Sequence, residues 1–320
     1  MKINALTEYK IPNKKIKKGL MIQRIWTQRY LLFMSVPFII WTVIFKYLPL
    51  WGWTMAFQNY KPSRSFFEQE WTSLENFITL FGEGDFYLAL RNTLAMSLMG
   101  LVFGFIFPVT FALMLNEVRS TRFKRSIQTV SYLPHFISWV IAASMITQLL
   151  SIDGGLINSM LMTMGIIDEP FQFMAKPKIF WWLVTAADIW KETGWNSIIY
   201  ISAMAGIDLT LYEAAKVDGA SRLRRIWHIT LPGIKPTLSV ILIMNIGWLL
   251  SIGFERQMLL GNALVQSHAM VLDYYALKYG ISLGRYSYGT AIGMFKSVIS
   301  VFLLIFANKL AKKFGDGQVI

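Results

Sequence analysis

Long apolar runs alternate with shorter polar segments along this chain. A helix needs roughly 20 mostly apolar residues to cross a lipid bilayer. Six runs meet that length, at residues 30–49, 93–115, 130–150, 179–206, 237–253 and 287–310. Pro37, Gly104 and Pro108 fall inside these runs, where neighbouring helices can satisfy the backbone groups that such residues leave free. The pattern therefore predicts an all-α, polytopic membrane protein with about six transmembrane helices.

Composition supports a membrane environment and excludes several kinds of site. Hydrophobic residues make up 55% of the 320 residues and charged residues only 15%, whereas soluble domains carry about 25% charged residues. Cysteine is absent, which excludes disulfides, thiolate metal sites and a cysteine nucleophile. The three histidines, His135, His228 and His268, are too scattered for a metal site, and no G-x-x-x-x-G-K-[ST] phosphate-binding loop occurs. We therefore expect neither bond-breaking chemistry nor ATP binding by this chain.

The distribution of basic residues predicts the topology. Most lysines and arginines lie before the first run, at 119–125, at 216–235 and at 309–313. Cytoplasmic connections carry such an excess, so we expect both termini in the cytoplasm and an even number of spans. The formal charge of +13 is then explained by orientation and by attraction to anionic lipid, and it does not indicate nucleic-acid binding.

This topology divides the chain into three parts. A basic cytoplasmic tail covers residues 1–29, a transmembrane domain covers 30–311, and a short cytoplasmic tail covers 312–320. A cytoplasmic loop at about 207–236 interrupts the domain between the fourth and fifth spans.

The loop contains the stretch EAAKVDGASRLRRIWHITLP, residues 213–232. Asp208 is a suitable N-cap for a helix at about 209–216, and Gly219 can adopt the left-handed conformation that ends it. A second short helix is expected at 221–228, with Pro232 stopping it before the next span. The two helices would fold into a rigid projection whose apolar face is too large to be buried within the loop. This arrangement favours a partner protein.

The spacing of this stretch resembles the EAA loop of ABC-importer permeases. The matching residues are Glu213, Ala214, Ala215, Asp218, Gly219, Ala220, Ile229, Leu231 and Pro232. Ile226 occupies a further position of the pattern but departs from it, because the family usually has Phe there. The wider stretches WKETGWNSIIYISAMAGID and LYEAAKVDGAS resemble the oligosaccharide branch, which includes maltose-type permeases and polysaccharide permeases.

The resemblance implies a type I importer fold and a set of partners. It implies a second permease subunit, a homodimeric cytoplasmic ATPase that binds ATP and Mg, and an extracytoplasmic solute-binding protein, all at the bacterial cytoplasmic membrane. This chain itself would hold no cofactor. Its loop would dock into a cleft of the ATPase, with Glu213 meeting basic groups and Gly219 making the turn.

A polar stripe in the fourth run is a candidate substrate path. Asp188, Lys191 or Glu192, and Trp195 recur at helical spacing, and ionisable residues at bilayer depth usually face a pathway. The candidate residues on the fourth and fifth runs are Asp188, Lys191, Glu192, Trp195, Asn196, Tyr200, Asn245, Trp248 and Ser251. The alternative is a structural ion pair between Asp188 and Lys191.

Two questions about function stay open at this point. Lys46, Lys191 and Lys296 suggest an acidic oligosaccharide of the uronate or alginate type, but lysines near span ends often extend towards the interface. A stand-alone secondary transporter or channel would also fit six spans with intramembrane charges, and a membrane-embedded enzyme acting on glycans is a further rival. The transporter or channel leaves residues 213–232 unexplained, and the sequence offers no catalytic constellation for the enzyme.

Overall fold

The computed structural model describes residues 26–313. The basic tails expected at 1–29 and 312–320 therefore lie almost wholly outside the described residues. Contacts between Cα atoms separate the chain into a unit that ends at Thr54 and a larger unit that begins at Met55.

The first unit is helical from Arg29 onwards. Helix α2 (Arg29–Thr42) continues through a π-helical turn, η1 (Val43–Tyr47), into the 3₁₀ segment η2 (Leu48–Phe57). Pro37 lies inside α2 without ending it. The stretch Arg29–Phe57 is long and apolar enough to cross a membrane, which confirms the first predicted span.

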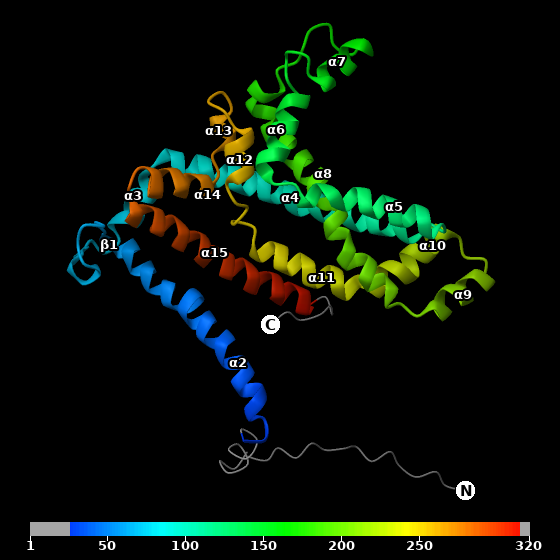
Figure 1. The fold of residues 1–320 in the computed structure, drawn as a ribbon, viewed down its shortest axis with the longest axis horizontal. Coiled ribbons are helices and arrows are strands. Elements are labelled where there is room, and N and C mark those ends of the chain that lie inside the picture. The colour runs from blue at the N-terminus through cyan, green and yellow to red at the C-terminus, as the bar shows by residue number, and fades with distance from the viewer. Residues whose placement is uncertain (1–25, 314–320) are drawn as a thin grey trace. The chain divides into compact units, whose positions relative to one another are not determined.

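Two long helix pairs build the larger unit (Figure 1). Helix α4 (Gly84–Asn116) packs along α8 (Pro177–Ala205), and α11 (Leu231–Gly247) packs along α15 (Tyr286–Lys313). Pro108 is buried within α4 and does not interrupt it. The second, fourth and sixth predicted spans correspond to α4, α8 and α15.

The third predicted span is not one continuous helix. Helix α5 (Thr121–Tyr132) ends in the 3₁₀ turn η4 (Leu133–Phe136), and α6 (Trp139–Leu149) leaves it at an angle of 103°. Pro134 has no N–H to donate, and Ser138 starts a new helix by accepting a hydrogen bond from the N–H of Ile141. The prediction of an unbroken helix at 130–150 was therefore wrong, because hydropathy does not register a cap inside an apolar run.

The loop between α8 and α11 also departs from prediction. After a bend of 74° the chain forms α9 (Leu209–Val217), close to the helix expected at 209–216. The next helix, α10 (Arg222–Arg225), continues through the π-helical η6 (Ile226–Thr230) into α11, so that Arg222–Gly247 is one helical stretch. Pro232 does not stop it, since the wider π turn accommodates the ring and its missing hydrogen bond.

The fifth span is shorter at its other end than expected. Helix α11 ends at Gly247 rather than at Gly253, which instead adopts a positive φ of 79° in the following turn. With the bent pairs each counted as one span, the described residues hold up to six spans, and four without them.

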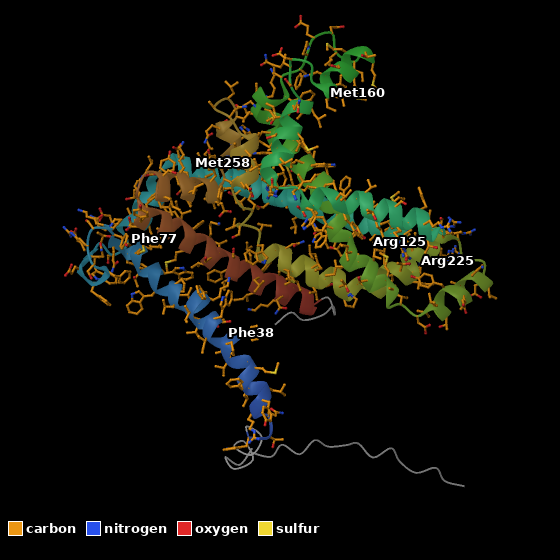
Figure 2. The ribbon with its side chains drawn as sticks, viewed as in Figure 1. Phe38, Phe77, Arg125, Met160, Arg225 and Met258 are labelled. Atoms are coloured by element: carbon orange, nitrogen blue, oxygen red, sulfur yellow. The ribbon has the colours of Figure 1, made fainter. Side chains whose placement is uncertain are left out.

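Short elements connect the long helices. They are β1 (Gln58–Asn59) paired antiparallel with β2 (Glu70–Trp71), η3 (Phe66–Glu68), α3 (Glu75–Gly82), α7 (Leu156–Thr163), η5 (Phe173–Ala175), α12 (Glu255–Leu260), α13 (Gln266–Ala269), α14 (Leu272–Tyr275) and η7 (Ala276–Ser282). Figure 2 shows that Arg125 and Arg225 lie at one end of the larger unit and Phe77 at the other.

Candidate functional site

Helix α9 begins and ends with the capping groups that the sequence predicts. The Asp208 carboxylate accepts a hydrogen bond from the N–H of Thr210 at 2.9 Å. This bond stabilises the charged form and lowers the pKa of Asp208. At the other end, Gly219 has a positive φ of 73°, as expected for the residue that terminates the helix.

The turn after α9 is a Schellman motif. The N–H of Ala220 donates to the carbonyl of Ala215 at 2.8 Å, and the N–H of Gly219 donates to the carbonyl of Lys216 at 3.2 Å. These two bonds satisfy carbonyls that the end of a helix otherwise leaves without partners. The turn directs the chain from α9 into α10.

Two contacts hold α9 and the bend before it against the end of η6 and the start of α11. The Tyr212 hydroxyl and the Thr230 hydroxyl are 2.9 Å apart, and Ile207 approaches Gly233 so closely that a Cβ there would lie 2.7 Å from the Ile207 side chain. The loop is therefore folded as a unit. It nevertheless leaves Leu209, Val217 and Trp227 exposed.

The loop residues that match the EAA pattern share this projection. Glu213, Ala214, Asp218 and Gly219 are exposed, Ala215 and Ala220 are half-buried, and Ile226, Ile229 and Leu231 are half-buried on the helical stretch that follows. Glu213 and the apolar side chains are thus both available to a partner.

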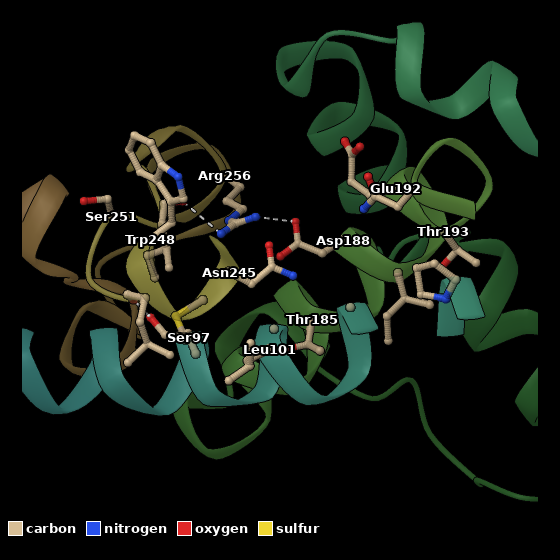
Figure 3. A pocket seen from close by; sticks show the side chains of 18 residues that line it. Ser97, Leu101, Thr185, Asp188, Glu192, Thr193, Asn245, Trp248, Ser251 and Arg256 are labelled. Carbon is tan, nitrogen blue, oxygen red and sulfur yellow. Dashed lines mark hydrogen bonds and ion pairs between the residues drawn. The ribbon is translucent and has the colours of Figure 1, made fainter. Parts of the chain in front are cut away.

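A polar cavity of about 320 Å³ lies between α4, α8 and α11 (Figure 3). Six of the candidate path residues line it: Asp188, Glu192, Asn196, Asn245, Trp248 and Ser251. Helix α4 contributes Ser97 and a glycine-rich wall at Gly100 and Gly104. Amide, hydroxyl and carboxylate groups beside an indole ring suit a ligand rich in hydroxyl groups.

Asp188 forms an ion pair across the cavity. Its Oδ1 lies 2.6 Å from Nη1 of Arg256, which comes from α12. Nη2 of Arg256 donates to the carbonyl of Ile252 at 2.9 Å. Asp188 therefore forms its ion pair with Arg256. The alternative prediction, an ion pair between Asp188 and Lys191, was wrong.

Lys191 is not among the residues that line this cavity. Its Nζ donates to the carbonyl of His135 at 2.6 Å, lies 3.3 Å from Oε1 of Glu192, and sits 5.6 Å from the ring centroid of Trp139. The side chain is almost fully buried. Lys191, a candidate path residue from the sequence, thus fastens α8 to the α5–α6 break and has a structural role, with a different partner from the Asp188 that the alternative prediction gave it.

His135 joins the same contact. Nδ1 of His135 lies 2.7 Å from Oε2 of Glu192, and its ring stacks on Trp195 at a centroid distance of 4.3 Å with an angle of 1° between the planes. Glu192 therefore faces the cavity while being held by His135 and Lys191.

Trp195 and Tyr200 line a second cavity of about 580 Å³ on α8 and α11. Asn196 and Asn245 line both cavities, so the two are adjacent. Tyr200 is buried beside Phe105 and contributes more to packing than to the cavity surface.

Sequence reasoning missed Arg256 and His135. Arg256 lies just after the fifth apolar run and His135 lies inside the third, where the sequence excludes it as a metal ligand and indicates no other role. Both reach the site because the chain breaks into short helices at η4 and α12, which hydropathy alone does not indicate. Within residues 26–313, no three His, Asp or Glu side chains gather as metal ligands would.

Comparison with known proteins shows extensive similarity. Residues 100–316 match the sequence pattern of a family described as "Binding-protein-dependent transport system inner membrane component". The chain is 44% identical over 303 residues to the polygalacturonan/rhamnogalacturonan transport system permease protein YteP of Bacillus subtilis, covering 95% of this chain and 94% of that protein. It is 43% identical over 286 residues to protein LplB of the same organism, covering 89% of each.

Two solved structures share the fold. A chain of a bacterial ABC transporter involved in the import of the acidic polysaccharide alginate superposes with a TM-score of 0.82 and 38% identity, covering 92% of this chain and 98% of that one. A chain of a bacterial alginate ABC transporter in complex with an alginate pentasaccharide-bound periplasmic protein gives 0.85 and 38%, covering 93% and 99%.

Proposed function

Because this chain belongs to the family of binding-protein-dependent transport system inner membrane components, in which it is an ABC-transporter permease, we propose that it carries acidic oligosaccharides across the bacterial cytoplasmic membrane. Two kinds of observation support the substrate class. The cavity presents hydroxyl-, amide- and charge-bearing side chains beside Trp248, and relatives with 44% and 38% identity are named for acidic polysaccharides.

One observation carries the proposal most directly: the helix that lines the cavity, α8, leads directly into the coupling loop. Helix α8 lines the cavity with Asp188, Glu192 and Asn196. At Ala205 it ends, and after a 74° bend the chain enters α9 with Glu213. A partner that moves α9 would therefore move the cavity wall.

The partner at α9 is a cytoplasmic ATPase in this proposal. The exposed Glu213 would meet basic groups of the ATPase, while Leu209, Val217 and Trp227 would lose their exposure to water. ATP and Mg would be bound by that partner, as two copies of one subunit. A second permease subunit would complete the pathway, and an extracytoplasmic solute-binding protein would deliver the sugar.

Reconstitution into lipid vesicles tests this proposal. The permease, its partner permease and the ATPase are incorporated together. The binding protein and a labelled trigalacturonate are added on the side of the vesicle membrane that carries the extracytoplasmic face of the complex. We expect uptake that requires ATP hydrolysis and stops with a non-hydrolysable ATP analogue. Uptake by this chain alone, driven by an ion gradient, would instead support a secondary transporter.

A further inference from the structure

The inference concerns the group in the cavity that recognises the charge of an acidic sugar, and it rests on the proposed function. Three charged side chains line the cavity among the residues that the structure describes: Asp188, Glu192 and Arg256. Arg256 is the one cation of the three. An acidic oligosaccharide that enters this cavity therefore meets a single positively charged group.

Of the three lysines that the sequence suggested for this role, the two in the larger unit are engaged elsewhere. Lys191 is buried against His135, Glu192 and Trp139. Lys296 on α15 forms an ion pair with Asp273. Lys46 belongs to the unit that ends at Thr54. Neither Lys191 nor Lys296 appears among the residues that line the cavity.

The guanidinium group of Arg256 is positioned but not saturated. Nη1 is bound to Asp188 at 2.6 Å and Nη2 to the carbonyl of Ile252 at 2.9 Å. Its Nε is buried and has no hydrogen-bond partner among the described residues. A guanidinium group carries five N–H donors in a planar fork that matches a carboxylate, so Arg256 retains donors for a second anionic group.

The carboxylate of Asp188 already binds the guanidinium group of Arg256 as the carboxylate of a ligand would. The Asp188 carboxylate is chemically the same group as the carboxylate of a uronic acid, and it reaches Arg256 from the opposite wall of the cavity (Figure 3). Replacing one carboxylate by another on the same guanidinium group keeps the cation paired throughout. A neutral sugar cannot make this exchange, because it would leave a partly buried charge without an equivalent partner.

We propose that Arg256 is the specificity-determining residue for acidic sugars in this cavity, and that Asp188 is an internal substitute which the substrate carboxylate displaces. In the empty cavity Asp188 holds the guanidinium group in place. When a uronate enters, its carboxylate takes over the Nη1 contact, and the Asp188 carboxylate turns to the hydroxyl groups of the sugar. The exchange also releases α8 from α12, so that occupancy of the cavity reaches the helix that leads into α9.

The test compares one sugar with and without its charge. Trigalacturonate and its fully methyl-esterified form are bound to the purified complex of both permeases and the ATPase, without the binding protein, and affinities are measured by equilibrium dialysis. For the native complex we expect tighter binding of the acid than of the ester. In Arg256→Gln the acid should lose at least about tenfold in affinity and the ester much less. Equal binding of acid and ester by the native complex, binding of neither, or equal losses in the variant would overturn the inference.

Asp188→Asn should change the affinity for the acid in the opposite direction to Arg256→Gln. If Asp188 competes with the substrate for Arg256, its removal should raise the affinity for the acid by about threefold or more and leave the ester unchanged, because the competent fraction of Arg256 increases. A purely structural pair would give a lower affinity for both probes. Arg91→Gln serves as the control, since it removes an arginine that binds a backbone carbonyl outside the cavity.

A double variant keeps the test valid if single substitutions impair assembly. Asp188→Asn combined with Arg256→Gln removes both charges of the pair together, so that neither is left buried without its partner. It should co-purify with its partners as the native chain does, and bind the acid as weakly as the ester. A double variant that still prefers the acid contradicts the inference. The proposed function is judged separately, since ATP-dependent oligosaccharide uptake that persists without this preference would leave it standing.

Discussion

At the scale of single residues, the turn at Gly219 makes a sharp prediction. Its φ of 73° lies in the left-handed region, which costs an L-residue roughly 1–2 kcal/mol. Gly219→Ala should therefore reduce the population of the correctly folded turn by roughly a factor of 5 to 30, while membrane insertion continues. We expect less ATPase to co-purify with the complex and slower ATP-driven uptake.

Gly206→Ala is the matched control in the same loop. Its φ is −85°, and a Cβ there would meet the carbonyl of Ala203 at an ordinary 3.5 Å. This variant should recover as much ATPase as the native chain. If both glycine variants behave alike, the Schellman turn is not what sets the docking geometry.

Single residues also show how far sequence reasoning reaches. Asp208 and Gly219 were predicted correctly because a cap and a left-handed turn depend on neighbours within a few positions. The cavity-facing side chains of α8 were found because helical spacing places Asp188 and Glu192 on one side. Their partners, Arg256 and His135, are 68 and 57 positions away in the chain. Nothing local to α8 indicates them.

At the scale of elements, a single carboxylate, that of Glu83, fastens the start of α4 to α14 and α15. Glu83 accepts hydrogen bonds from the hydroxyls of Tyr275 and Tyr288, each at 2.6 Å, and lies 3.3 Å from Arg285. Burial raises the pKa of Glu83, but these donors and the charge of Arg285 outweigh it and hold the pKa below its usual value. The same contact raises the pKa of Tyr275, by burial and by its bond to Glu83.

The lowered pKa gives Glu83 a defined pH dependence. Its charged form stabilises the fold above the unfolded-state pKa, and this contribution disappears as pH falls through the lower folded-state value. Glu83→Gln should therefore lower the free energy of unfolding in detergent at pH 7 by on the order of 1–3 kcal/mol. The measurement is a lower melting temperature than that of the native protein. The difference from the native protein should shrink as the pH falls below about 4.

The exposed carboxyl group of Glu68 supplies a control for this experiment. Glu68→Gln removes the same charge without touching the two tyrosines, so its melting temperature should follow that of the native chain at both pH values. A constant difference between Glu83→Gln and the native chain across the pH range would contradict the assignment.

The predicted elements agree with the structure where a single helix spans an apolar run. They disagree where two helices meet inside the same apolar run. Helices α4 and α15 extend the expected spans by several residues. The break between α5 and α6 and the π turn before Pro232 were not foreseen. Both depend on how proline is accommodated, by a break at Pro134 and by a wider turn at Pro232, and the residue type alone does not decide between these outcomes.

At the scale of the whole molecule, the arrangement links a polar cavity with a folded surface loop through one helix. Lys191, His135 and Glu192 tie the middle of α8 to the α5–α6 break, and Tyr212 with Thr230 ties α9 to the start of α11. A displacement at α9 is thus transmitted to α8 and α11 together, which are the two helices that supply Asn196 and Asn245 to the cavities. The charge-exchange step at Arg256 would act on the same helix from the other side.

The basic residues predict the orientation of this arrangement in the membrane. Arg125 and Arg225 lie at one end of the larger unit (Figure 2), and an excess of such residues predicts the cytoplasmic side. The chain contains no cysteine, so Glu70→Cys and Val217→Cys each introduce a single thiol. In right-side-out vesicles, a membrane-impermeant maleimide should label Glu70→Cys directly and Val217→Cys only after permeabilisation.

The same thiol reports on docking. Val217 is 88% exposed in the isolated chain, so its thiol should react readily in permeabilised vesicles that hold the permeases alone. Co-expression of the ATPase should slow that reaction, because a partner seated on α9 excludes the reagent, whereas the rate at Glu70→Cys should stay the same. Labelling of Val217→Cys from the outside would reverse the topology. A rate that is indifferent to the ATPase would place the docking surface elsewhere, since an exposed apolar side chain beside Gly219 cannot remain accessible under a seated subunit.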